Sequence, residues 1–260
     1  MCIRDRVSKL YASDVHEIRS LNIALRFVPQ TGEGYNVLIQ DDIILRDRQF
    51  EKKVLAIYRQ FNGNIGVLSF RHGANLGLDE IKAEIVETDV IESVYGQGMV
   101  ETPLAPGHAA IRMVCMRSPQ CISFDTIRNV GLLDEKFAPY TYDDYDYSLR
   151  CMKAGLQNVV YALKVSSRVE WGGMRRSPQP GVAAIMKRNR QYVYQDHADF
   201  IRTVPPEEFR GTPPKIPVDA PNEDMETAML GYQYNRAHLS AFINRRRFNI
   251  VRRLREKFSI

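Results

Sequence analysis

Residues 35–45 read YNVLIQDDIIL, a short apolar run interrupted by two aspartates. An apolar run of this length is typical of a buried strand, and the acids lie where that strand should end. Residues 48–61 follow as an amphipathic helix, with Asp47 as its expected N-cap. The next run, IGVLSF at residues 65–70, is again typical of a buried strand. Strand, helix and strand joined by tight turns predict a βαβ unit and a parallel sheet.

The rest of the chain continues this alternation. Further helices are expected at residues 15–27, 123–131, 143–155 and 182–204, and further strands at residues 111–117 and within 159–171. Residues 72–110 show no regular pattern, and a Pro-dense segment follows the last of these helices. We therefore expect three parts: an α/β domain over residues 7–204, a Pro-rich linker over 205–222 and a basic helical extension over 223–260.

Composition places the chain among globular proteins. It has 260 residues, of which 44% are hydrophobic and 26% charged, enough to bury a substantial core. No apolar run approaches the ~20 residues that a membrane-spanning helix needs. The four cysteines form no C-x-x-C pair, and their spacing matches no zinc site. Free thiols in a reducing compartment are the simplest interpretation, so we expect a cytoplasmic protein.

Much of the net charge of +5 lies in residues 237–258, AHLSAFINRRRFNIVRRLREKF. On a helix, this segment places aromatic and aliphatic side chains near one face and arginines over much of the rest. Such a helix can lie on an anionic membrane, so we expect peripheral contact with the inner face of the cell membrane and no nucleic acid partner. The alternative is that the apolar face packs on the α/β domain and the arginines are only solvated.

A second acidic stretch, YTYDDYDYSLR, spans residues 140–150. If a helix begins near Asp143, then Asp143 and Asp144 lie on its first turn, where the helix dipole favours negative charge. Asp146 precedes Arg150 by four residues, the better orientation for an ion pair along a helix. Asp146 therefore has a structural explanation and Asp143 a partial one. Asp144 has the weakest structural explanation, which makes it the functional candidate.

Asp41 and Asp42 form the first acidic site. In open α/β sheets, ligands bind beyond the carboxyl ends of the strands. Carboxylates at that place can hold Mg²⁺ or Mn²⁺, which prefer oxygen ligands and often bridge to substrate phosphates. The alternative is that the two acids simply open a turn and face solvent, because such pairs are common in turns.

Two blocks of the sequence resemble family-2 glycosyltransferases. NVGLLDEKFAPYTYDDYDYSLRCMKAG is similar to the acceptor-side signature of that family, and SLNIALRFVPQTGEGYNVLIQDDIIL is similar to its earlier block. The resemblance covers roughly residues 20–175. It implies a GT-A fold, a Rossmann-like, mostly parallel sheet flanked by helices. It also implies a UDP-, GDP- or dTDP-sugar donor, a divalent metal, and a glycan or lipid-linked acceptor, as in polysaccharide biosynthesis.

The resemblance also assigns residues. Asp42 matches the last acid of the family's metal motif and Asp41 its middle position, so both would bind the metal and the donor diphosphate. The first acid of that motif is Gln40 here, which is a departure from the family. Asp144 matches the catalytic base of inverting transfer, and Asp143 matches the acidic residue before it. The base takes the proton of the acceptor hydroxyl as that oxygen attacks the anomeric carbon.

The resemblance leaves some features open. Few residues precede the first block, so we expect the first strands of the family's sheet to be missing from this chain. Some relatives carry a further histidine ligand at a position where this chain reads SSRVEWGG and has no histidine; Glu170 is the residue there that could substitute for it. Two other functions use the same acids. One is a metal-dependent nucleotidyl- or phosphotransferase, and the other is a non-catalytic interaction protein in which the acids only cap helices.

Overall fold

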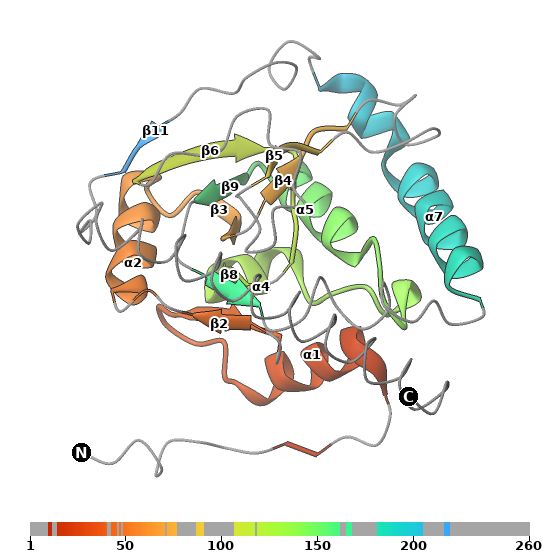
Figure 1. Cartoon of the computed structure of the whole chain (residues 1–260), viewed down its shortest axis with the longest axis horizontal. Coiled ribbons are helices and arrows are strands. Elements are labelled where there is room, and N and C mark those ends of the chain that lie inside the picture. Colours follow the sequence, from red (N-terminus) through yellow and green to blue (C-terminus); the bar gives the residue numbers. More distant parts are fainter. Residues whose placement is uncertain are drawn as a thin grey trace, which may run out of the picture.

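The protein is an α/β fold in which a mixed six-stranded sheet is flanked by helices (Figure 1). The computed structural model describes residues 10–11, 15–40, 43–45, 47, 49–70, 72–76, 87–90, 107–117, 119–161, 165–167, 181–204 and 216–218. The helices are α1 (His16–Phe27), α2 (Phe50–Gln60), α4 (Phe124–Val130), the 3₁₀ turn η2 (Glu135–Phe137), α5 (Asp143–Lys153) and α7 (Val182–Thr203).

The strands form one main sheet and two small ones. The main sheet has the order β1-β8-β3-β9-β6-β11, and the small ones are β10-β2 and β5-β4-β7. The bounds are β1 (Tyr35–Leu38), β2 (Ile43–Leu45), β3 (Ile65–Ser69), β4 (His72–Ala74), β5 (Glu87–Val90), β6 (His108–Arg112), β7 (Val114–Cys115), β8 (Gln120–Ser123), β9 (Gln157–Tyr161), β10 (Val165–Ser167) and β11 (Ile216–Pro217).

The main sheet corrects the expectation of a mostly parallel sheet. β1 and β3 do flank the helix α2 in the chain, but both pair with β8 in antiparallel register, so β8 lies between them. β3 and β9 form the parallel pair, whereas β6 pairs antiparallel with β9 and with β11. A buried apolar run indicates that a strand is covered on both faces, but it does not indicate which strand is its neighbour or in which direction that neighbour runs.

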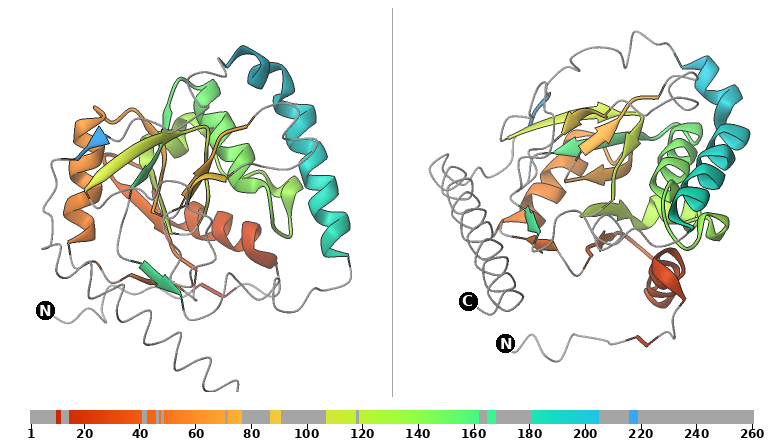
Figure 2. Two further views of the ribbon diagram at one scale, coloured as in Figure 1. Left: turned by 45° about the horizontal axis from the view of Figure 1, so that its top comes forward. Right: turned by 45° about the vertical axis from the view of Figure 1, so that its right-hand side comes forward.

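The core lies on both faces of the main sheet. Alternate residues of a strand point to opposite faces, and the adjacent residues Val67 and Leu68 of β3 accordingly join different apolar clusters. One cluster contains Ile57 and Tyr58 of α2, and the other contains side chains of α5 and α7. Figure 2 shows α2 on one side of the sheet and α5 with α7 on the other. The strands therefore position two helical layers around one sheet.

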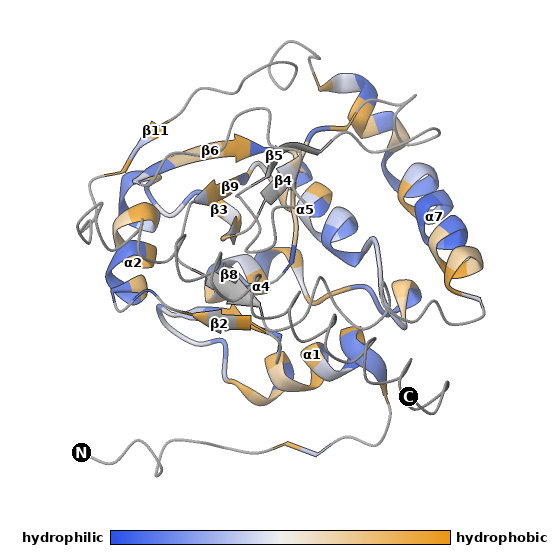
Figure 3. Ribbon diagram, in the orientation of Figure 1, coloured by the Kyte–Doolittle hydropathy of each residue, from blue (hydrophilic) through white to orange (hydrophobic). Residues whose placement is uncertain are grey.

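Most predicted helices are confirmed. Both α2 and α7 carry polar and apolar faces, visible as blue and orange in Figure 3. The N-cap of α2 is Gln49 rather than the expected Asp47. Asp47 lies just before it, accepts a hydrogen bond from Gln49 N at 3.0 Å, and binds Lys53 Nζ at 2.5 Å. Asp47 therefore lies two residues before the cap and is paired with the buried cation Lys53.

Helix α5 packs very closely on the sheet. A Cβ atom at Gly66 of β3 would lie 2.3 Å from Cβ of Cys151, so only glycine allows the helix to approach the strand at this point. The helix ends as predicted, because Gly155 follows the C-cap with φ of +80°. This contact fixes the position of α5, and with it the acidic residues at its N-terminus.

The predicted strand at residues 111–117 is divided. β6 ends at Arg112 and continues after Met113 as β7, which pairs with β4 in a separate small sheet. β11 lies within the range predicted as a linker and pairs with β6. The C-terminal extension over 223–260, including the basic segment 237–258, lies outside the described residues. The division into domains therefore stays a prediction.

Candidate active site

The acidic stretch at residues 143–146 forms the first turn of α5, as predicted. The helix begins after Tyr142, which has φ of +65°, and Asp146 N donates to Tyr142 O at 3.0 Å in the first turn. Asp143 and Asp144 therefore lie beside the N–H groups of the first turn, which have no carbonyl partner within the helix, and beside the positive end of the helix dipole. This location offsets part of the repulsion between two neighbouring carboxylates.

Asp143 is buried and paired with Arg117. Its side chain is 1% exposed and that of Arg117 is 8% exposed. Arg117 Nη2 donates to Asp143 Oδ1 at 3.3 Å, and Nη1 forms an ion pair with Oδ2. Burial raises the pKa of Asp143, although Arg117 acts against this rise. Arg117 is itself buried, yet Asp143 and Glu17 outweigh that effect and raise its pKa, so it stays charged.

Asp144 differs from its two acidic neighbours because its partners are neutral. Its Oδ1 accepts from Tyr145 N at 3.1 Å and its Oδ2 from Arg117 N at 3.4 Å. Within the described part of the chain, no cationic side chain forms an ion pair with it. The side chain is half-buried. Burial raises the pKa of Asp144, although the charge of Arg117 and the backbone donors act against this rise. Asp144 is therefore a carboxylate with increased basicity and some access to solvent.

A chain of polar contacts joins this turn to the end of β1. Glu17 of α1 forms an ion pair with Arg117, with 3.2 Å between Oε2 and Nη2. The other oxygen of Glu17 accepts a hydrogen bond from Gln40 Nε2. Gln40 lies two residues beyond β1 and directly precedes Asp41. The structure thus brings the carboxyl end of β1 to the first turn of α5, with Glu17 and Arg117 between them.

Asp41 and Asp42 lie outside the described residues, and so does Glu170. Their surroundings are described in part. Ser167 of β10 pairs with Ile43 of β2, the residue that directly follows Asp42. The chain on either side of the first acidic motif is therefore held by Gln40 on one side and by the small β10-β2 sheet on the other. The assignment of both aspartates as metal ligands stays a prediction.

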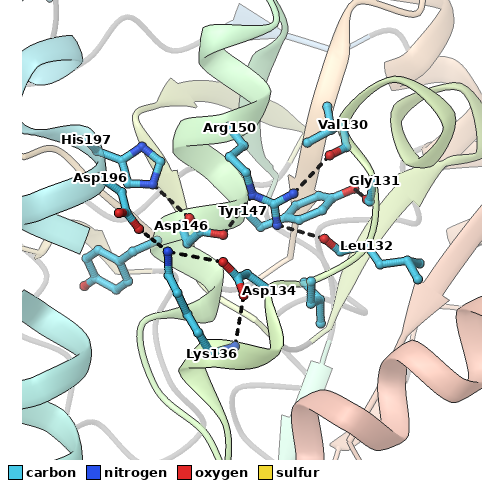
Figure 4. A network of polar contacts seen from close by, with 12 residues as sticks. Val130, Gly131, Leu132, Asp134, Lys136, Asp146, Tyr147, Arg150, Asp196 and His197 are labelled. Carbon is cyan, nitrogen blue, oxygen red and sulfur yellow. Dashed lines mark hydrogen bonds and ion pairs between the residues drawn. The ribbon is translucent and has the colours of Figure 1, made fainter. Parts of the chain in front are cut away.

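Asp146 has the structural role that its spacing predicts. Its Oδ2 accepts from Arg150 Nε at 2.8 Å, and Oδ1 lies 2.8 Å from Nε2 of His197 on α7 (Figure 4). Arg150 also donates to the carbonyl oxygens of Val130 and Leu132, at 3.0 and 2.8 Å. Burial opposes ionisation of Asp146, but His197 and Arg150 outweigh it and lower its pKa. This network ties α5 to α7 and to the turn after α4.

One group of side chains in the described residues has the spacing of a metal site. Ligand atoms of Asp146, Asp196 and His197 lie within 4.8 Å of one another. However, Arg150 Nε already binds Asp146, and Lys136 Nζ forms an ion pair with Asp196 (Figure 4). These two cations compensate the carboxylates that a metal ion would need. We therefore interpret this group as a polar contact between helices.

Sequence reasoning missed the residues that surround the acidic turn. Arg117 lies 26 positions from Asp143 in the chain. Glu17 lies in α1, much earlier in the sequence. His197 lies in α7, for which the sequence predicted a helix and no functional residue. No local spacing connects these residues to Asp143 or Asp146, so only the arrangement of the helices reveals their partnership.

The sequence matches no protein-family model, and it matches none of the curated proteins. Among the described residues, no helix is both long and apolar enough to span a bilayer. The interpretation of the site therefore depends on its residues and their geometry.

Proposed function

We propose that this chain is a glycosyltransferase of family-2 type with a GT-A-like fold, and that Asp144 is its general base. The observation that carries the proposal is the environment of Asp144. Its carboxylate lies at the start of a fixed helix, has a raised pKa and has no cationic partner in the described residues. A base needs a free lone pair and a pKa moved toward the working pH, and Asp144 has both.

Its acidic neighbours carry different roles. Asp143 is neutralised by Arg117 and holds the turn in place. Asp146 is neutralised by Arg150. In the proposed reaction, Asp144 accepts the proton of an acceptor hydroxyl while that oxygen bonds to the anomeric carbon of the donor sugar. The bond between this carbon and the diphosphate breaks, and its electron pair leaves with the nucleoside diphosphate.

The donor would lie at the end of β1, where Asp41 and Asp42 follow Gln40. Carboxylates are the ligands that Mg²⁺ and Mn²⁺ prefer, so these two residues fit a divalent ion. Such an ion, when bound, stabilises negative charge on the leaving diphosphate. The chain's own contribution is the link from Gln40 through Glu17 and Arg117 to the turn of Asp144. This link sets the distance between the donor site and the base.

The acceptor and the cellular location belong to the same proposal. A glycan or a lipid-linked sugar supplies the hydroxyl, and the basic segment 237–258 would keep the enzyme at the inner face of an anionic membrane. Flotation with anionic and neutral vesicles tests this part. Binding to both, or to neither, contradicts it.

The experiment for the reaction measures release of nucleoside diphosphate from UDP-, GDP- and dTDP-sugars with Mn²⁺ present, with and without a lipid-linked oligosaccharide acceptor. We expect Asp144→Asn to lower turnover by about 10²–10⁴-fold, because the variant keeps the shape and loses the proton acceptor. Asp125→Asn is the matched control, since that carboxylate on α4 is exposed and pairs with Arg128 of the same helix. Transfer from a labelled nucleoside triphosphate instead, or full turnover in Asp144→Asn, contradicts the proposal.

A further inference from the structure

The loop before α5 has an unfavourable backbone conformation. Thr141 and Tyr142 have φ of +75° and +65°, and neither is glycine. Side chains with a Cβ atom rarely adopt this left-handed region, and two consecutive residues in it persist only where the surrounding structure holds them. The residue that follows them is Asp143, and then comes Asp144. The backbone conformation of Thr141 and Tyr142 therefore sets the direction of the Asp144 side chain, the proposed base.

Asn189 of α7 holds this loop. Its side chain is completely buried, and Nδ2 lies 2.8 Å from Phe137 O and 2.9 Å from the carbonyl oxygens of Tyr140 and Thr141. An amide group has two N–H donors, so three backbone acceptors share them. A single side chain thus binds the carbonyl group at the end of η2 and those of two loop residues directly before the acidic turn.

The neighbouring contacts orient Asn189 itself. Arg188 Nε donates to Asn189 Oδ1 at 3.0 Å, which assigns the other end of the amide as the donor. Arg188 Nη2 also donates to Ala138 O at 2.7 Å, within the same loop. Two turns further along α7, His197 contacts Asp146 of the helix. Side chains of helix α7 therefore form hydrogen bonds both with the loop and with the first turn of α5.

We propose that Asn189 is a positioning residue for the proposed base: it holds Thr141 and Tyr142 in their left-handed conformation so that Asp144 faces the acceptor. This inference depends on the proposed function for its catalytic consequence. It does not depend on that function for its structural part, which is that the Asn189 side chain keeps Thr141 and Tyr142 in this conformation. A residue with a purely structural role would affect the folding of the domain without a selective effect on the turn.

The test compares Asn189→Ala with Val193→Ala. Val193 lies one turn along the same face of α7, is 1% exposed and packs in the apolar core. Both variants remove a buried side chain from α7, but only the first removes the donors to the loop. Asn189→Ser, which keeps one donor, is a milder second variant if the alanine variant yields too little folded protein.

The first measurement is hydrogen exchange of backbone amides and needs no substrate. We expect Asn189→Ala to accelerate exchange at residues 141–146 by at least about 10-fold relative to the rest of the domain, including Asp146 N, which bonds to Tyr142 O. Val193→Ala should show no such local increase. Unchanged exchange at these residues in both Asn189 variants overturns the proposal.

The second measurement is steady-state turnover with the donor that the wild-type protein uses. We expect Asn189→Ala to lower kcat by about 10–100-fold, because a displacement of the base by about 1 Å has an effect of this size. KM for the donor should stay within about twofold, because the mutation does not touch the end of β1. Wild-type kcat in a folded Asn189→Ala variant overturns the proposal. If the wild-type protein transfers from no donor, the proposed function fails, and the exchange measurement still decides whether Asn189 holds the loop.

Discussion

Replacement of Asp146 by asparagine should destabilise the protein without the selective loss of turnover expected for Asp144→Asn. The side chain of Asp146 is 3% exposed and bonds to Arg150 and His197, each at 2.8 Å. Removal of one partner from a buried ion pair costs about 3–5 kcal/mol, because the remaining charge stays buried. Arg150 keeps two backbone carbonyl acceptors, and its side chain is 26% exposed. We therefore expect the lower end of this range, about 3 kcal/mol.

The assay is thermal and urea-induced unfolding at pH 7, where a loss of this size lowers Tm by about 6–12 °C for a chain of this length. Asp196→Asn is the control, because that carboxylate and its partner Lys136 are 38% and 37% exposed. A surface pair of this kind contributes about 0–1 kcal/mol. If Asp146→Asn unfolds within 1 kcal/mol of the wild type, or no more easily than Asp196→Asn, the structural role of Asp146 is wrong.

The effect should depend on pH in one direction. Because the pKa of Asp146 is lowered in the folded state from its usual value of 3.8, its ionisation stabilises the fold above that value. The stabilisation is lost as pH falls through the folded pKa. The difference between wild type and Asp146→Asn should therefore be full at pH 7 and shrink below about pH 3.8. A difference that stays constant down to acid pH contradicts the assignment of the stabilisation to the ionised carboxylate.

Three further predictions follow from other contacts. Lys53→Met should destabilise the protein by about 3–5 kcal/mol in urea unfolding, because it leaves the buried Asp47 carboxylate without its cation; a neutral result contradicts this. Gly66→Ala should cost about 1–3 kcal/mol or more, since its Cβ would meet Cys151 at 2.3 Å; unchanged thermal unfolding refutes the close approach. The raised pKa of Asp144 predicts that kcat/KM falls with decreasing pH through a limb above 3.8; a limb at or below that value argues against this base.

Local patterns in the sequence predicted the elements and the acidic turn well. The apolar run at β3, the amphipathic spacing of α2 and the glycine after α5 depend on residues that are neighbours in the chain. The ion pair between Asp146 and Arg150 was predicted for the same reason, because residues four apart meet on one face of a helix. The position of Asp143 and Asp144 on the first turn also follows from local signals.

The partners of those elements come from distant parts of the chain, and no local pattern encodes them. β8 separates β1 from β3 because its two edges satisfy the backbone groups of both strands, whereas the sequence predicted that parallel neighbours would do so. Arg117 forms its ion pair with Asp143 and donates its backbone N–H to Asp144, because the chain after β7 passes the first turn of α5. Side chains far apart in sequence meet only when the sheet and helices pack. The sequence determined which residues are acidic and on which turn, and tertiary packing alone decided which of them pairs with the buried cationic side chain of Arg117.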